Sequence, residues 1–203
     1  MSEFERWQGR FAADEYIFGT EPNAFLKSNA GLLRPGQKAL AIADGEGRNG
    51  VWLAEQGLDV LSVDFSPNGL TKAERLAATR GVRLKTERVD LEHWQWPVRA
   101  FDVVAAIFIQ FAGPAFREKI FAGIRGALKP AGLFILEGYG PKQLEYATGG
   151  PSELGNLYTP ELLSKAFGDW DILSLRDYDS LVSEGTRHSG MSALVDLVAR
   201  KPG

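Results

Sequence analysis

The chain has 203 residues with no cysteine, two histidines and a formal net charge of −3. This length indicates one large domain or two small ones and is sufficient to bury roughly 70 % of the unfolded surface without a disulfide or a metal. The composition excludes a disulfide scaffold, a thiolate metal site and a catalytic cysteine and disfavours a histidine-rich metal site, and the charge gives no general attraction to nucleic acid or anionic membranes.

The chain begins with about 35 mixed, aromatic residues, which predict one or two short helices before the turn at Pro35. From residue 38 onward, short apolar runs alternate with amphipathic stretches, as expected when strands alternate with helices. The expected strands are 38–43, 60–63, 82–89, 101–109 and 133–136. The expected helices are 48–56, 67–81, 116–128 and 159–167.

The C-terminal third departs from this alternation. Residues 138–155 are rich in Gly, Pro and Tyr and predict a long loop. Two further strands are expected at 170–178 and 191–199. The segment between them is too short for a helical crossover, so we expect them to pair antiparallel. The preceding alternation predicts a doubly wound α/β sheet that is mostly parallel, with helices on both faces.

A glycine-rich turn follows the first expected strand. Residues 45–50 read G-x-G-x-x-G and open a helix, so the backbone can approach a ligand and the helix start can bind an anionic or polar group. Asp64 ends the next strand 20 residues after Asp44, the position from which an acid binds ribose hydroxyls. The alternatives are a plain tight turn and an Asp64 that caps the turn at Ser66. Together the two features favour an adenosine-containing cofactor.

The charge of the turn bears on which cofactor it binds. Asp44 and Glu46 would repel a pyrophosphate and attract an ammonium group. These residues favour S-adenosylmethionine over NAD, whose fold also needs a second nucleotide-binding half. An NAD(P)-dependent oxidoreductase and a non-catalytic S-adenosylmethionine-binding protein remain the alternatives.

Five segments of the chain, which include the glycine turn and Asp64, carry a resemblance to a known family. They are residues 39–49, 63–66, 89–91, 101–104 and 128–132, and the chain end at 190–200 is similar as well. With these motifs the chain resembles class I S-adenosylmethionine-dependent methyltransferases, and within them the small-molecule group of tellurite- and thiopurine-methyltransferase-like proteins. The resemblance implies a Rossmann-like sheet of seven strands with an antiparallel last strand. It also implies a single methyltransferase domain over 1–203, with a helical lid segment at 1–35 and a core at 36–203.

The resemblance implies roles for individual residues. Gly45 and Gly47 would flank the methionine part of the cofactor, Asp64 would hold the ribose, and Asp90 would accept from the adenine amino group. The cofactor-binding residues expected are Asp44, Gly45, Glu46, Gly47, Asn49, Asp64, Phe65, Asp90, Leu91 and Ile107. The chain departs from the family at Ala41 and Ala43, where an acid and a glycine are usual.

The acceptor is expected to be a small molecule such as a thiol, a chalcogen oxyanion or a heterocycle, because residues 106–111 lack the motif of nucleobase amino-methylating enzymes. Aromatic residues near the N-terminus predict a lid or, alternatively, a satellite core. The catalytic candidates are Tyr16, Glu184 and His188, although the position of His188 between the last two expected strands favours a solvated loop histidine over a catalytic one. We expect a cytoplasmic monomer or homodimer, since neither a signal peptide nor an apolar run of roughly 18 residues is present.

Overall fold

The computed structural model describes residues 3–185 and 188–203. The strands are β1 Lys38–Ile42, β2 Asp59–Asp64, β3 Lys85–Arg88, β4 Phe101–Ile107, β5 Leu128–Tyr139, β6 Asp171–Glu184 and β7 His188–Arg200. The α-helices are α1 Glu3–Arg10, α2 Ala24–Ser28, α3 Arg48–Glu55, α4 Pro67–Arg80, α5 Pro114–Ala127, α6 Gln143–Tyr146 and α7 Pro160–Phe167. Short 3-10 helices cover Ala30–Leu32 and Leu154–Asn156.

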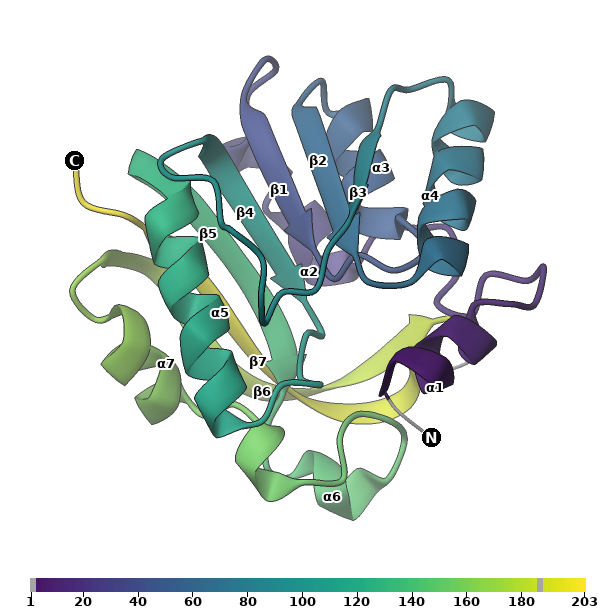
Figure 1. Cartoon of the computed structure of the whole chain (residues 1–203). Coiled ribbons are helices and arrows are strands. Elements are labelled where there is room, and N and C mark those ends of the chain that lie inside the picture. Colours follow the sequence, from purple (N-terminus) through teal and green to yellow (C-terminus); the bar gives the residue numbers. More distant parts are fainter. Residues whose placement is uncertain (1–2, 186–187) are drawn as a thin grey trace.

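The strands form one seven-stranded sheet in the order β3-β2-β1-β4-β5-β7-β6 (Figure 1). The first five strands pair in parallel, and β7 runs antiparallel to both β5 and β6. The predicted fold class is therefore confirmed, including the antiparallel β7. The crossover helices place all parallel strand ends at one edge of the sheet, where ligands bind in folds of this kind.

Helices cover both faces of the sheet, so the central strands are almost wholly apolar. Side chains of α5 and α7 pack with Leu40, Val104 and Leu136 in one core cluster. Side chains of α2 and α3 pack with Ala39, Val103 and Ile135 in another. Neighbouring residues of one strand thus belong to opposite cores, which explains why 101–109 reads as a continuous apolar run.

The predicted helix boundaries are confirmed where capping residues mark them. Ser66 precedes α4, and its Oγ accepts a hydrogen bond from the Gly69 N–H at 3.2 Å. Gly81 ends the same helix in the left-handed region, with φ 69°. Thr159 caps α7 in the same way as Ser66 caps α4, because its hydroxyl accepts from the Leu162 N–H.

The C-terminal strands are longer than the sequence predicts. Strands β6 and β7 form a hairpin whose pairing reaches Glu184 and His188, which lie opposite each other. The prediction of strands limited to 170–178 and 191–199 is therefore wrong, because the polar residues between them continue the ladder on an exposed edge strand. The predicted loop at 138–155 is also partly wrong, since β5 continues to Tyr139 and α6 lies within it.

The N-terminal segment and the hairpin meet at the same side of the molecule (Figure 1). A side chain at Gly185, which has φ 70°, would lie 2.4 Å from the Ile17 carbonyl oxygen, so the two backbones are in close contact. No helix within the two described ranges combines the length and the apolar character needed to cross a membrane.

Candidate functional site

The glycine turn, residues 43–50, joins β1 to α3. Gly47 has φ 85°, and a Cβ there would lie 2.4 Å from the Cβ of Ala73 in α4. Only glycine fits this position, because a side chain would be both strained and in collision. Ala43 also has a positive φ, 48°. This strained alanine stands where the resembled family has a glycine, and the backbone keeps the conformation that explains that preference.

Asp44 holds the turn from within. Its Oδ2 accepts from the Gly50 N–H at 3.0 Å and from the Ser62 hydroxyl at 2.8 Å. Burial raises the pKa of Asp44 to about 7, against the effect of these two donors. Ala41, where the family has an acid, is buried in the sheet. The acid beside the turn therefore comes from Asp44, two residues beyond the end of β1.

Asp64 connects the end of β2 to the same turn. Its Oδ2 accepts from the Gly45 N–H at 2.9 Å, and its Oδ1 accepts from the Ser66 N–H at 2.8 Å. The turn-capping alternative is thus confirmed. Burial raises the pKa of Asp64 to about 6. Since a carboxylate oxygen can accept more than one hydrogen bond, these contacts leave acceptor capacity for a ligand, and the ribose-binding role stays a prediction.

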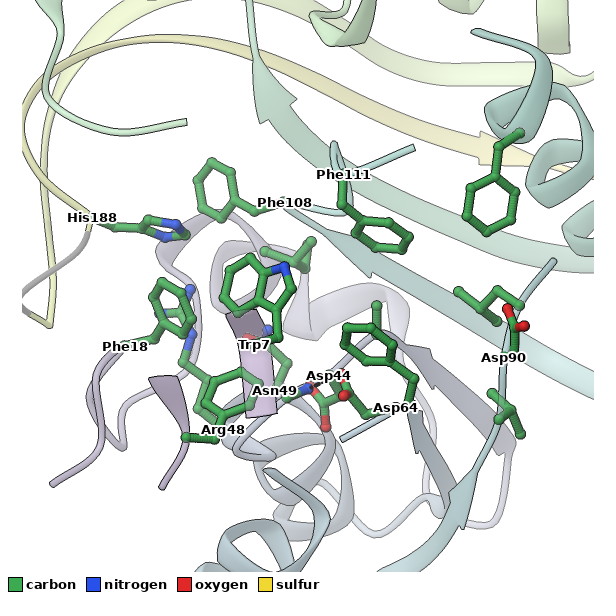
Figure 2. A pocket seen from close by; sticks show the side chains of 18 residues that line it. Trp7, Phe18, Asp44, Arg48, Asn49, Asp64, Asp90, Phe108, Phe111 and His188 are labelled. Carbon is green, nitrogen blue, oxygen red and sulfur yellow. Dashed lines mark hydrogen bonds between the residues drawn. The ribbon is translucent and has the colours of Figure 1, made fainter. Parts of the chain in front are cut away.

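A cavity of about 210 Å³, here called the Asp64 cavity, opens above the turn. Figure 2 shows Asp44, Asn49 and Asp64 close together, with His188 and Asp90 at opposite sides of the view. The residues expected from the sequence that line it are Asp44, Gly45, Asn49, Asp64, Phe65, Asp90, Leu91, Ile107 and His188. The tertiary structure therefore brings nine of the expected residues together around one space.

Four expected residues lie outside this lining. Gly47 supports the turn, and Glu46 pairs with the Lys72 ammonium at 2.5 Å, buried beneath α4. The hydroxyl of Tyr16 donates to the Lys72 carbonyl at 2.9 Å. The fourth residue, Glu184, lies at the end of β6. The structure thus gives Glu46 and Tyr16 contacts that hold the N-terminal segment against α4.

Glu184 pairs with Arg48 across 136 positions of sequence, at 2.6 Å. It also accepts from the Ala24 N–H at 2.9 Å and from the Asn23 side-chain amide at 3.1 Å. That amide donates to Glu137 as well. These contacts assign Glu184 a positioning role: it ties the hairpin, the start of α2 and the first residue of α3 together.

Arg48 lines the Asp64 cavity, and sequence reasoning missed it. One of its nitrogens, Nη1, is buried without a hydrogen-bond partner among the described residues. A buried guanidinium N–H without a partner is costly unless a ligand supplies one, and the residue that carries it lines a cavity. The sequence feature that could have identified Arg48 is its position as the first residue of a helix that follows a glycine turn.

A second cavity of about 680 Å³, here called the Gly150 cavity, adjoins the first. It is lined by α1 and by residues 148–153, among others. The two cavities share five lining residues, of which four are Trp or Phe and one is a histidine. The shared residues are Trp7, Phe18, Phe108, Phe111 and His188. The N-terminal aromatic residues Trp7 and Phe18 therefore line both cavities, and their role as a lid stays a prediction.

His188 lies within an aromatic group at this junction. Its ring centroid is 4.3 Å from that of Phe108, 4.6 Å from Phe18 and 5.8 Å from Tyr139. Burial lowers the pKa of His188 to about 3, and the charge of Arg48 adds to this. The solvated-loop alternative is wrong, because the residue starts β7 and packs against three rings. Its Nδ1 has no hydrogen-bond partner among the described residues.

Asp90 lies at the far side of the Asp64 cavity. Its carboxylate accepts from the Glu92 N–H at 3.0 Å and contacts the His93 ring at 2.7 Å. The hydrogen bond from His93 is the largest effect that lowers the pKa of Asp90. This acid is therefore ionised at neutral pH and accessible. In the described ranges no group of three or more His, Asp or Glu residues is placed to hold a metal ion.

Comparison with known families identifies one segment. Residues 39–132 match the family model described as a methyltransferase domain. A glycine/sarcosine N-methyltransferase of Parasynechococcus marenigrum is 32 % identical over 105 residues, which is 50 % of this chain and 37 % of that protein. The chain spans less than half the length of the curated relatives it matches.

Solved structures extend the likeness in fold to the whole chain. A structure from work on the conversion of a disulfide bond into a thioacetal group during echinomycin biosynthesis has a TM-score of 0.79 at 16 % identity, and the match covers 99 % of this chain and 93 % of that one. TehB from Haemophilus influenzae has a TM-score of 0.71 at 14 % identity, covering 98 % and 66 %. TehB is one distant neighbour among many, so the likeness does not establish the specific subgroup.

Proposed function

We propose that the chain transfers a methyl group from S-adenosylmethionine to a small-molecule acceptor, and the match of residues 39–132 to the methyltransferase domain model supports this activity. The observation that carries the proposal is the pair of joined cavities at the carboxyl ends of the parallel strands. One is lined by the glycine turn and three acids, Asp44, Asp64 and Asp90, and the other is large enough for a small acceptor.

The residues of the Asp64 cavity fit S-adenosylmethionine. The unpartnered Nη1 of Arg48 would bind the carboxylate of its methionine part. Asp44 and Asp64, whose burial favours a cationic or hydrogen-bonding partner, would face its ammonium and ribose hydroxyls. Asp90 would accept from the adenine amino group, with Leu91 and Ile107 as apolar walls.

When bound, the cofactor supplies a methyl group on a cationic sulfur, which a nucleophile can attack without a metal. The protein has to align the acceptor and exclude water from the site. Trp7, Phe18 and Phe108 line both cavities and would exclude water at the junction. Because burial lowers the pKa of His188 to about 3, its imidazole is neutral in the free protein, and the unpartnered Nδ1 can accept a hydrogen bond that orients the acceptor's O–H, S–H or N–H group.

A small-molecule acceptor is supported by the relatives as well. Glycine and sarcosine, named in the curated relative, are small molecules. The Gly150 cavity lies under α1 and under the turn at Gly149 and Gly150. A cavity of about 680 Å³ suits a compact acceptor such as a thiol, a chalcogen oxyanion or a heterocycle.

The test is calorimetric titration with S-adenosylhomocysteine and with NADH, followed by an acceptor screen with a radiolabelled methyl donor. We expect S-adenosylhomocysteine to bind and NADH to fail, and we expect label to appear in at least one small acceptor. Binding of NADH alone would overturn the proposal in favour of an oxidoreductase.

A second candidate, a non-catalytic S-adenosylmethionine-binding protein, is motivated by Ala41 and Ala43, where the resembled family has an acid and a glycine. The structure supports binding in spite of both, because Asp44 supplies the acid and Ala43 adopts the glycine-like φ. Tight S-adenosylhomocysteine binding with no labelled product from any acceptor would favour this candidate.

A further inference from the structure

Tyr139 lines the Gly150 cavity and carries a buried polar atom that has no partner in the described part of the chain. The residue is 1 % exposed, and this atom is its hydroxyl oxygen. Its backbone, by contrast, is fully used: the N–H donates to the Gln110 side chain, and the carbonyl accepts from Gln110 and Tyr158. An unpartnered buried hydroxyl costs free energy unless a ligand supplies the partner.

The ring of Tyr139 is held in place, so the hydroxyl cannot turn away to find another partner. Gly150 has φ 85°, and a Cβ there would lie 2.7 Å from Cδ2 of this ring. On another side, the Phe108 ring centroid lies 4.7 Å from that of Tyr139. Burial raises the pKa of Tyr139 well above its usual range, which keeps the hydroxyl protonated and a donor.

Two arginines contribute to the lining of the same cavity. Arg6 and Arg10, one turn apart on α1, both line it, and Glu153 is the acid in the described lining. Both guanidinium groups lie against the Trp7 ring, at 5.7 Å and 4.7 Å from its centroid. Two guanidinium groups beside an aromatic face and one carboxylate favour an anionic, planar ligand.

We propose that the Gly150 cavity binds a small aromatic carboxylate that bears a hydroxyl or thiol group. Its carboxylate is bound by Arg6 and Arg10, its ring packs against Trp7 and Phe108, and Tyr139 donates a hydrogen bond to its hydroxyl oxygen or thiol sulfur. That group lies on the His188 side of the cavity. The inference rests on the proposed function in one respect: the same compound would be the methyl acceptor.

The first experiment compares two probes of the same shape and different charge. Para-hydroxybenzoate and para-hydroxybenzamide are titrated into the protein saturated with S-adenosylhomocysteine, and para-mercaptobenzoate and its amide form a second pair. We expect each carboxylate to bind at least about tenfold more tightly than its amide. The double variant Arg6→Gln/Arg10→Gln should remove this preference, whereas Arg83→Gln, an exposed arginine outside the cavity, should retain it.

The second experiment removes the unpartnered hydroxyl. Tyr139→Phe should weaken para-hydroxybenzoate binding about tenfold and leave the melting temperature unchanged or higher, because no internal hydrogen bond is lost. Tyr146→Phe is the control: its hydroxyl donates to Asp179 at 2.9 Å and lies outside the cavity, so probe affinity should stay the same. A lower melting temperature together with unchanged probe affinity in Tyr139→Phe would overturn the proposal.

The outcomes separate this inference from the function on which it rests. If S-adenosylhomocysteine binds and label reaches some acceptor, but the amides bind as well as the carboxylates, the inference fails and the methyltransferase proposal stands. If the carboxylates bind selectively but S-adenosylhomocysteine does not bind, the ligand class stands and the methyltransferase proposal fails.

Discussion

Two regions of the molecule enclose the joined cavities, and they hold their shape in different ways. The glycine turn is fixed by backbone N–H groups that donate to Asp44 and Asp64, all within about 20 positions of sequence. The roof, formed by α1, residues 16–19 and 148–153, and His188, is fixed by ring contacts and by the Arg48–Glu184 pair.

The amino-acid sequence therefore specifies the glycine turn and the roof in different ways. Backbone hydrogen bonds demand particular residues at particular spacings, so the turn carries a readable pattern. Ring packing accepts many residue combinations, so the roof has no sequence pattern of comparable specificity. Substitutions in the turn should therefore affect the fold and cofactor binding, and substitutions in the roof should affect the choice of acceptor. Four predictions test this division.

The largest effect is expected from Gly47→Ala. The new Cβ would meet Ala73 at 2.4 Å while the residue keeps φ 85°, and strain plus collision should lower the free energy of unfolding by about 3 kcal/mol or more. Chemical denaturation measures the loss. Gly126→Ala in α5 is the control, because its Cβ would meet nothing within 4 Å, and it should stabilise the protein slightly. Equal effects of the two would contradict the rigid turn.

The next effect concerns the acid at the end of β2. Asp64→Asn should weaken S-adenosylhomocysteine binding by about 1–3 kcal/mol, since the ribose hydroxyls lose a carboxylate acceptor. Asp59→Asn, at the opposite end of the same strand, should leave the affinity unchanged. Calorimetry measures the S-adenosylhomocysteine affinity of both variants, and their para-hydroxybenzoate affinity shows whether the roof has changed. The division between turn and roof would be wrong if Asp64→Asn weakened para-hydroxybenzoate binding and left S-adenosylhomocysteine binding unchanged.

A pH titration sharpens the same point. Burial raises the pKa values of Asp64 and Asp44 to about 6 and about 7. Bound hydroxyl and ammonium groups favour the ionised carboxylates, so binding releases protons at acidic pH. The S-adenosylhomocysteine affinity should therefore rise at least about tenfold from about pH 5 to about pH 7 and level off near pH 8, about one unit above the pKa of Asp44. The rise should be smaller in Asp64→Asn, and a flat profile in the unmodified protein would show that neither acid meets the ligand.

The smallest effect is expected from Ala43→Gly. Alanine is strained at φ 48°, and glycine relieves this strain at the cost of a more flexible unfolded chain. The balance should be a gain of up to about 1 kcal/mol, seen as a rise of about 2–4 °C in melting temperature. Binding of S-adenosylhomocysteine should persist. A lower melting temperature would mean that the alanine methyl contributes packing that outweighs its strain.

The predictability of the site follows the same division. Of the nine expected residues that line the Asp64 cavity, all except His188 lie in the glycine turn or at the end of a strand, where the sequence pattern is local. Glu46 matched the sequence pattern equally well, but Lys72 of α4 pairs with it. Charge at a turn predicts a polar contact, and only the packing of the neighbouring helix shows whether that contact is a ligand or another side chain.

The sequence by itself determined the alternation of strands and helices, the single sheet, the glycine turn and the two strand-end acids, because periodicity, capping and turn chemistry act over a few residues. The tertiary structure decided what the roof contains. Arg48 and Glu184 are paired, and His188 packs against Phe18, although more than 130 positions of sequence separate the members of each pair. Such contacts depend on how β7 is inserted antiparallel beside β5 and where its hairpin then reaches, which no local pattern encodes.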